Sequence, residues 1–177
     1  MTPLDELLAA TAHLRDAAAF ERQHPEPALS LRVPAGDAPA AGAPVKLNDT
    51  LDDDGFKRLF ASPLDRTHVA FLRKSERNPF GNIVSLGRAA TNDVCVPHPS
   101  VSKVHAVFMR VGQGWKVADR GAKNGLFVQR VPVETGATAA VEDGALLGFG
   151  TVVEATFHLP AGLFQYLELV RRVRAGA

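Results

Sequence analysis

The sequence predicts a mainly β protein, an antiparallel β-sandwich with a helix before it and a helix after it. From residue 68 on, short runs rich in β-branched and other apolar residues alternate with turn signals such as Asn124-Gly125 and Asp143-Gly144. Many short strands at this spacing are typical of two packed antiparallel sheets. The expected strands are His68–Arg73, Ile83–Leu86, Val94–Val96, Ala106–Val111, Trp115–Ala118, Leu126–Gln129, Ala145–Phe149 and Val152–Leu159.

The composition is that of a soluble globular protein. Of the 177 residues, 46% are hydrophobic and 22% are charged, and the formal net charge is +1, so the chain can build one core of ordinary size. Residues 1–60 carry 6 Lys/Arg against 10 Asp/Glu, and residues 61–177 carry 14 against 9. The basic excess of the second part suits acidic ligands, but it is far from the basic footprint of a nucleic-acid-binding protein.

The cellular compartment is predicted from cysteine usage and the N-terminus. The single cysteine, Cys95, excludes an internal disulfide framework and suits a reducing compartment. No apolar run approaches the ~18 residues that span a bilayer. Charged residues interrupt the apolar pattern of the N-terminus, which is not typical of a signal peptide. We therefore expect a cytoplasmic protein, and the compact build and the Ala-, Arg- and Val-rich composition suggest a bacterial one.

The N-terminal segment, residues 1–24, is predicted to be one amphipathic helix over residues 3–22. Its apolar positions recur at three- and four-residue spacing, with Thr2 as N-cap and Pro3 at the first helical position. The positions are Leu4, Leu7, Leu8, Thr11, Leu14 and Ala18. We expect this helix to pack against the main domain or against a second copy.

Residues 25–60 are predicted to be a Pro/Ala-rich linker followed by an acidic segment. Five prolines lie between residues 25 and 44, most of them separated by Ala and Gly, a composition typical of a semi-extended linker. Asp52–Asp54 then precede a short predicted helix, Phe56–Phe60. A calcium loop is excluded because Ala61 stands where a bidentate Glu would be needed.

The sandwich is expected over residues 61–160 and a closing helix over residues 161–177. Alternation in the strands predicts odd-numbered core positions: Val107, Met109, Val111, Trp115 and Val117. The closing helix has an apolar face of Leu163, Tyr166, Leu167 and Val170 and a basic end of Arg171, Arg172 and Arg174, which is expected to be solvated.

Four polar motifs lie at the ends of the expected strands. They are Gly87-Arg88, Ser102 to Ala106, Trp115 to Asp119 and Lys123-Asn124-Gly125. Loops at one edge of a rigid scaffold are where binding residues concentrate. An Arg, a Ser, a Lys and an Asn-Gly turn at one edge predict a site for a dianionic group such as phosphate.

With these motifs in order, residues 68–159 resemble a forkhead-associated domain, the phosphothreonine-reading β-sandwich of signalling proteins. The family has seven sequence motifs in a fixed order, and each has a counterpart here. In the family they are Gly-Arg, Asn-Asp-Val/Ile, Val-Ser-Arg-x-His-Ala, an aromatic strand ending in Asp, Ser-x-Asn-Gly-Thr, Asp-Gly-Asp and Phe-Gly. They are Gly87-Arg88, Asn92-Asp93-Val94, Val101 to Ala106, Trp115 to Asp119, Ala122 to Leu126, Asp143-Gly144 and Phe149-Gly150. The resemblance covers about half the chain and implies about 11 strands.

The resemblance implies a role for each matching residue. Arg88 would bind the phosphate through its guanidinium and Ser102 through its hydroxyl, and Lys103 would add a point charge. Asn124 would hold the peptide backbone, with Lys123 beside it. Three residues would support the site: His105 would hold the Ser102 loop by hydrogen bonds, and Gly87 and Gly125 would permit the backbone turns.

The implied function is that of a non-enzymatic, cofactor-free adaptor that binds a phosphothreonine protein, a kinase or a kinase substrate. Leu126 and Ala122 stand where the family has Thr and Ser, so the loop lacks two hydroxyls. The alternative is therefore a degenerate sandwich that assembles with an unphosphorylated partner, as in a secretion or envelope complex. Thr50, in its acidic tract, is a candidate phosphorylated switch residue that would bind the site in the same chain or in a neighbouring copy.

Two other chemistries are weighed against this reading. Ser102, His105 and Asp119 could suggest a hydrolase, but no nucleophile elbow or oxyanion loop accompanies them. Cys95, His98 and His105 are good zinc ligands, but Cys95 lies in a strand pattern and no second ligand pair is present. We expect no metal, no nucleic acid and no membrane insertion.

Overall fold

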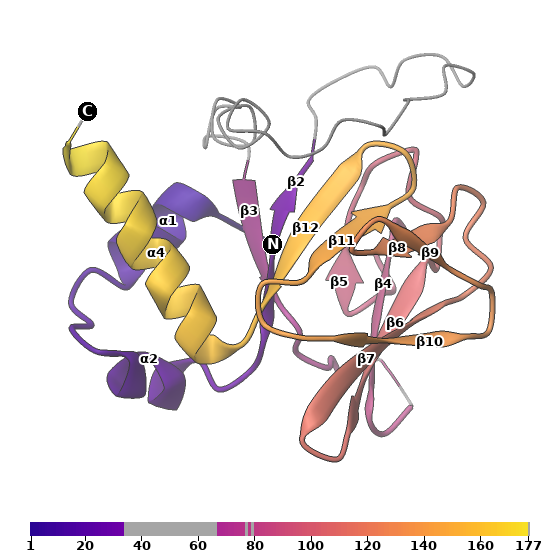
Figure 1. The fold of residues 1–177 in the computed structure, drawn as a ribbon, viewed down its shortest axis with the longest axis horizontal. Helices are drawn as coiled ribbons and strands as arrows, with labels where there is room; N and C mark the ends of the chain where they lie inside the picture. Colours follow the sequence, from indigo (N-terminus) through magenta and orange to yellow (C-terminus); the bar gives the residue numbers. More distant parts are fainter. Residues whose placement is uncertain (34–66, 77, 79, 177) are drawn as a thin grey trace.

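The computed structural model describes residues 1–33, 67–76, 78 and 80–176, which form a β-sandwich of two sheets with helices packed on one side (Figure 1). One sheet has the order β1 (Thr2–Pro3), β3 (Thr67–Phe71), β2 (Ala28–Arg32), β12 (Val153–His158), β11 (Leu146–Phe149), β8 (Leu126–Val128) and β9 (Val131–Val133). The other has the order β10 (Thr138–Val141), β7 (Gly114–Asp119), β6 (Ala106–Val111), β4 (Ile83–Gly87) and β5 (Val94–Cys95). The predicted β-sandwich is confirmed; the β4–β5 pair is parallel.

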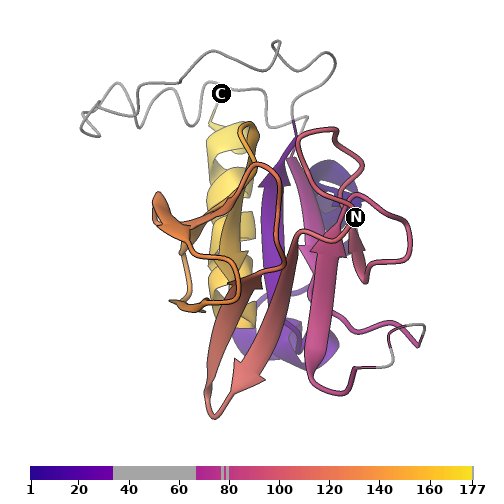
Figure 2. The same cartoon turned by 90° about the vertical axis from the view of Figure 1, so that its right-hand side faces the viewer.

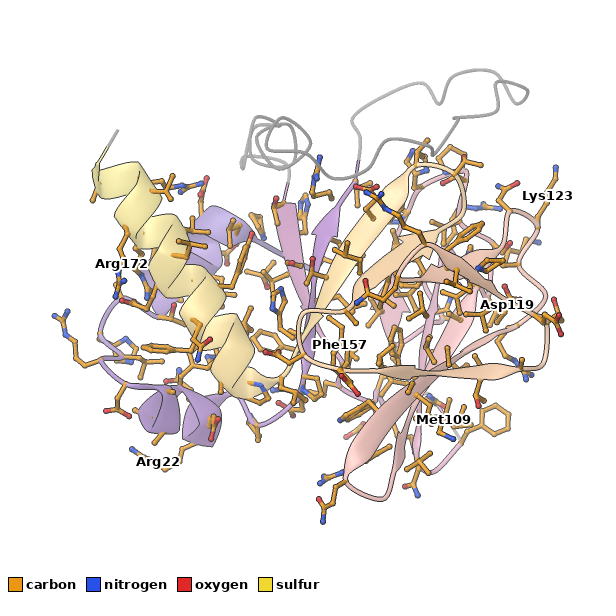
Figure 3. The ribbon with its side chains drawn as sticks, in the orientation of Figure 1. Arg22, Met109, Asp119, Lys123, Phe157 and Arg172 are labelled. Atoms are coloured by element: carbon orange, nitrogen blue, oxygen red, sulfur yellow. The ribbon has the colours of Figure 1, made fainter. Side chains whose placement is uncertain are left out.

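The core between the sheets is built from alternate residues of each strand, but in β6 the predicted odd-numbered core positions are wrong except for Val107, which is buried at 9% exposure. Ala106 and Phe108 are fully buried there, whereas Val111 is 48% exposed and Met109 only half-buried. Both faces of β6 carry apolar side chains, so the alternation does not distinguish them. In β7 the prediction holds for Val117, which is fully buried, as is Phe157 from the opposite sheet (Figure 3).

Part of the predicted linker is an interior strand of the larger sheet. β2 pairs with β3 on one side and β12 on the other, and its Leu29 and Leu31 are fully buried. Pro25 and Pro27 precede the strand, where their missing N–H groups break no ladder hydrogen bond. The linker prediction is therefore wrong for Ala28–Arg32. The acidic segment, Thr50 and the helix expected at residues 56–60 lie outside the described residues.

The single N-terminal helix predicted over residues 3–22 is wrong. The chain forms β1 and then two short helices, α1 (Leu4–Ala10) and α2 (Ala17–Gln23). Thr2 pairs with Val69 in the sheet and caps no helix. Asp16 is the N-cap of α2, since its carboxylate accepts from the Ala19 N–H at 2.7 Å, which satisfies a free amide of the first turn.

The closing helix α4 (Pro160–Ala175) packs with α1 and α2 over the outer face of the larger sheet; Figure 2 shows it behind the sandwich. Its basic end is only partly solvated, contrary to prediction. Arg171 donates to the Leu8 carbonyl at 3.1 Å and to the Thr11 hydroxyl at 2.7 Å, and Arg174 pairs with Asp5. In the described part of the chain, none of the helices has the length and apolar character needed to cross a membrane.

We expect the fold to lose stability between pH 6.5 and pH 4 because of a buried histidine between β12 and α4. His158 is 6% exposed, is hydrogen-bonded to the Ser30 hydroxyl at 2.9 Å and stacks on Tyr166. Burial lowers the pKa of His158 to about 4, although the charge of Asp143 acts to raise it. The unfolded chain therefore takes up this proton at a higher pH than the folded protein, which costs roughly 3 kcal/mol at pH 4.

Urea unfolding of the wild type and of His158→Gln at pH 7 and pH 4.5 checks this expectation. The wild type should lose more stability on acidification than the variant, which cannot titrate at this position. An equal loss in both proteins would contradict it.

Candidate functional site

Three loops meet at the side of the sandwich away from α4. They are the β4–β5 loop, which carries Arg88, the β5–β6 loop, which carries Ser102, and the β7–β8 loop, which carries Lys123 and Asn124. In Figure 3, Lys123 and Asp119 lie at the opposite end of the molecule from Arg172 of α4. The loops are joined by hydrogen bonds: the Arg88 N–H donates to the Ser102 carbonyl at 2.8 Å, and the Lys123 N–H donates to the Ser102 hydroxyl at 3.0 Å.

The guanidinium of Arg88 is oriented by its own protein. Its Nε donates to the Val101 carbonyl at 3.1 Å, and the residue is exposed. Its terminal amino groups, Nη1 and Nη2, make no hydrogen bond or ion pair with the described residues. The planar fork is thus fixed at its base, with two nitrogens available to a bidentate acceptor.

The Ser102 hydroxyl lies between the other two loops. It accepts from the Lys123 N–H, and therefore its own proton is available to a second acceptor. Lys103, the next residue, is exposed, and its carbonyl accepts from the Ala89 N–H at 3.1 Å. The ammonium groups of Lys103 and Lys123 are thus carried by backbone that is held directly beside this hydroxyl.

A fully buried histidine holds the Ser102 loop. His105 Nδ1 accepts from the Ser102 N–H at 3.1 Å, and Nε2 donates to the Gly125 carbonyl at 3.0 Å. Burial lowers the pKa of His105, while its hydrogen bond to Gly125 and the charge of Asp119 act in the opposite direction. The neutral ring with its proton on Nε2 fits both partners, so His105 joins the β5–β6 and β7–β8 loops.

The β7–β8 loop keeps its shape without the two hydroxyls that Ala122 and Leu126 lack. Asp119, 2% exposed, accepts from the Gly121 and Ala122 N–H groups, and the Asn124 side chain donates to the Ser100 carbonyl at 2.9 Å. The Leu126 side chain is fully buried in the core. Gly125 adopts a positive φ of 75°, the conformation that glycine enters without strain.

The hydrogen bonds of His105 and Asp119 also bear on the hydrolase alternative, which needs Ser102, His105 and Asp119 to be bonded to one another. Both ring nitrogens of His105 bind backbone groups, and the Asp119 carboxylate binds the N–H groups of its own loop. Ser102, His105 and Asp119 therefore do not form the nucleophile–base–acid chain of a Ser-His-Asp enzyme.

Asn92 has a structural role that the sequence motif alone did not assign. Its side chain is 8% exposed, and Nδ2 donates to the Ala89 carbonyl at 2.8 Å and to the Lys103 carbonyl at 2.7 Å. It thereby ties the Arg88 loop to the Ser102 loop. Gly87 is required beside it, because a Cβ at this position would collide with the Lys103 carbonyl oxygen and lie 2.9 Å from Asn92 Nδ2.

The neighbouring Asp93 fixes the base of the Arg88 loop. Its carboxylate accepts from the Ser75 N–H at 2.7 Å, from the Ser85 N–H at 2.7 Å and from the Ser85 hydroxyl at 2.9 Å. Burial acts to raise the pKa of Asp93, but the hydrogen bonds from Ser85 and Ser75 outweigh it and hold the pKa at about 2. The polar Asn92-Asp93 pair between two strands was the available sequence signal for this support.

The assembled edge has the chemistry of an oxyanion site. Loops that are hydrogen-bonded to one another carry an oriented guanidinium, a hydroxyl with a free proton and two exposed lysines, and the Asn124 side-chain carbonyl makes no hydrogen bond with the described residues. Donors of this kind match the terminal oxygens of a phosphate. A side-chain amide oxygen suits a peptide N–H of the same ligand.

Residues 84–150 match the family model of the FHA domain, and this range contains Arg88, Ser102, Lys103, Lys123 and Asn124. No curated protein sequence matches the chain. Similar solved structures include Mycobacterium tuberculosis EmbR in complex with a low-affinity phosphopeptide, at 26% identity and a TM-score of 0.41; the match covers 44% of this chain and 20% of EmbR. The FHA domain of CT664 from Chlamydia trachomatis matches at 14% identity with a TM-score of 0.48, covering 75% and 96% of the two chains.

Proposed function

Because the chain carries an FHA domain at residues 84–150, we propose that it is a phosphothreonine-peptide-binding adaptor of a Ser/Thr kinase pathway. The observation that carries the proposal is that the Arg88 N–H is bonded to the Ser102 carbonyl, while the guanidinium of Arg88 and the hydroxyl of Ser102 each keep donors available. Asn124 lies on the adjoining loop, suited to hold the peptide backbone. Lys103 and Lys123 supply further positive charge at the same edge.

The expected affinity is modest. Two or three charge-assisted hydrogen bonds contribute ~1.5–3 kcal/mol each, and they must offset the ordering of a flexible peptide. The dissociation constant should therefore be micromolar, which corresponds to a binding free energy of about −8 kcal/mol.

The test is a titration of the full chain with a degenerate phosphothreonine peptide library and with its unphosphorylated counterpart. Micromolar binding that requires the phosphate supports the proposal. Equal binding of both libraries, or binding of neither, would contradict it and favour the alternative of a sandwich that assembles with an unphosphorylated partner. The loop geometry favours the phosphate reading, since the Ala122 and Leu126 departures leave the loop held by Asp119.

Asn92 should act as a positioning residue for this binding. Asn92→Ala removes the side-chain bond to the Lys103 carbonyl, which joins the Arg88 loop to the Ser102 loop, and the bond to the Ala89 carbonyl within the Arg88 loop. We expect phosphopeptide affinity to fall by roughly tenfold and stability by about 1–3 kcal/mol.

Asn92→Asp is the matched control, because it keeps the size of the side chain but replaces the donor by an acceptor facing two carbonyls. It should bind phosphopeptide at least as weakly as Asn92→Ala at a temperature where both proteins are folded. Wild-type affinity in either variant would exclude a positioning role.

A further inference from the structure

The three loops of the site carry more positive charge than one phosphate uses. The segments 87–93, 96–105 and 119–125 contain four basic side chains, all exposed, and two carboxylates. The basic residues are Arg88, Lys103, Arg120 and Lys123. The carboxylates are Asp119, which is 2% exposed and accepts from two N–H groups of its own loop, and Asp93, which accepts from the Ser75 and Ser85 N–H groups. A ligand approaching this edge therefore meets four cations.

Backbone hydrogen bonds hold these cations around a single segment, Ser102–His105. The Arg88 N–H donates to the Ser102 carbonyl at 2.8 Å and the Lys123 N–H to the Ser102 hydroxyl at 3.0 Å. The Arg120 N–H donates to the His105 carbonyl at 3.0 Å, and Lys103 belongs to the segment itself. The backbone positions from which these four side chains extend are thus set by the fold.

Within the described residues, none of these four cations forms an ion pair with a carboxylate of the protein. The ion pairs in that part of the chain involve Arg32, Arg73, Arg171 and Arg174, which lie elsewhere. Glu134, exposed in the segment that bridges to Asp119 through Thr135, makes no such pair with Arg120. Four like charges held together repel one another unless a ligand neutralises them.

A phosphate supplies a charge of about −1.5 to −2, which leaves roughly two of the four cations to be matched by other groups. We propose, as an extension that rests on the proposed function, that this site selects phosphothreonine segments bearing carboxylates in the residues next to the phosphothreonine. Arg120 is not one of the residues proposed to bind the phosphate. It binds those carboxylates, together with whichever of Lys103 and Lys123 is not paired with the phosphate.

The experiment uses the full chain and four short peptides: phosphothreonine with neutral flanks, phosphothreonine with Asp and Glu flanks, and the unphosphorylated form of each. At low salt the acid-flanked phosphopeptide should bind about five- to tenfold more tightly than the neutral one, the size expected for one or two exposed ion pairs. This preference should fall to about twofold or less near 1 M salt, because the Debye length there is only about 3 Å and exposed ion pairs are screened.

Arg120→Gln should reduce the acid preference to about threefold or less and change the affinity for the neutral-flanked phosphopeptide by less than about twofold. Arg110→Gln is the matched control, since it makes the same charge change on β6, at an exposed arginine outside the three loops. It should leave the preference unchanged. Equal effects of the two substitutions would overturn the assignment of Arg120.

The outcomes separate this inference from the proposed function. Phosphate-dependent binding with no acid preference would overturn the inference and leave the phosphothreonine proposal intact. Loss of any phosphate dependence would overturn both. Acid-flanked unphosphorylated peptide binding as tightly as its phosphorylated form would likewise overturn both, because the edge would then bind acidic chains without reading phosphate.

Discussion

Arg88→Ala should weaken binding of a phosphothreonine peptide by at least about 100-fold, taking a micromolar affinity beyond ordinary titration. The substitution removes both free guanidinium nitrogens, and two charge-assisted hydrogen bonds contribute ~1.5–3 kcal/mol each. Because Arg88 is exposed and its side chain makes one hydrogen bond with the described residues, to the Val101 carbonyl, thermal stability should change little. Isothermal titration with a thermal melt of each protein measures both quantities.

Two further variants serve as controls for the Arg88→Ala measurement. Arg88→Lys keeps the charge but loses the planar fork, so we expect intermediate binding, weaker than wild type by roughly tenfold. Arg110→Ala removes an exposed arginine from β6 and should bind like the wild type. If Arg88→Ala binds as tightly as Arg110→Ala, the phosphate is not recognised at this edge.

The strands were the part of the fold most accessible to sequence reasoning. From β3 to β8 the apolar runs bounded by turns predicted strands within one or two residues of the observed bounds. β2, β9 and β10 were missed for physical reasons. β2 lies beside prolines that favour a linker, β9 contains Pro132, and β10 is an Ala-rich edge strand with weak intrinsic preference for a sheet.

Errors of phase and of helix continuity have a different origin. In β6, apolar residues occupy both faces, so only the packing of Phe108 against Phe149 and Phe157 decides which face is inside. At the N-terminus, the apolar spacing continued through two separate helices because both bury residues in the same hydrophobic cluster, Leu8 from α1 and Phe20 from α2. The break between them is set by the Asp16 cap, a local bond that periodicity does not detect.

The site was predictable as a set of motifs, whereas its internal support was not. Strand ends placed Arg88, Ser102 and Asn124 on loops of one edge, and the structure brings these loops together. The bonds that hold them, from Asn92 to the Lys103 carbonyl and from Asp93 to Ser85, join residues 8 to 11 positions apart on different elements. Such pairings depend on strand register, which the sequence leaves open.

His105→Ala should have the largest effect on stability among the residues of the site, a loss of about 3–5 kcal/mol. The His105 side chain is fully buried and packs edge-on against Phe149, with ring centroids 5.7 Å apart. Its removal leaves a cavity and the Ser102 N–H without its partner, while the Gly125 carbonyl loses one of its two hydrogen bonds and keeps the one from the Gly150 N–H. The orphaned Ser102 N–H costs about 1–3 kcal/mol, and the cavity and the lost bond to Gly125 add to this. Urea unfolding measures the loss, and a change below about 1 kcal/mol would contradict the assigned bonds.

Acidification of the wild type should produce the same defect without any substitution. Burial places the pKa of His105 below its value in the unfolded chain, so this contribution to stability is complete above pH 6.5 and declines as the pH falls. Protonation puts a hydrogen on Nδ1, so that this nitrogen faces the Ser102 N–H as a donor and can no longer accept from it. Phosphopeptide binding should therefore weaken on acidification together with the change in the His105 ring signals followed by NMR. The phosphate itself loses charge near pH 6, so the control is free phosphopeptide titrated over the same range. Binding that follows only the phosphate titration would show that the ring does not hold the Ser102 loop.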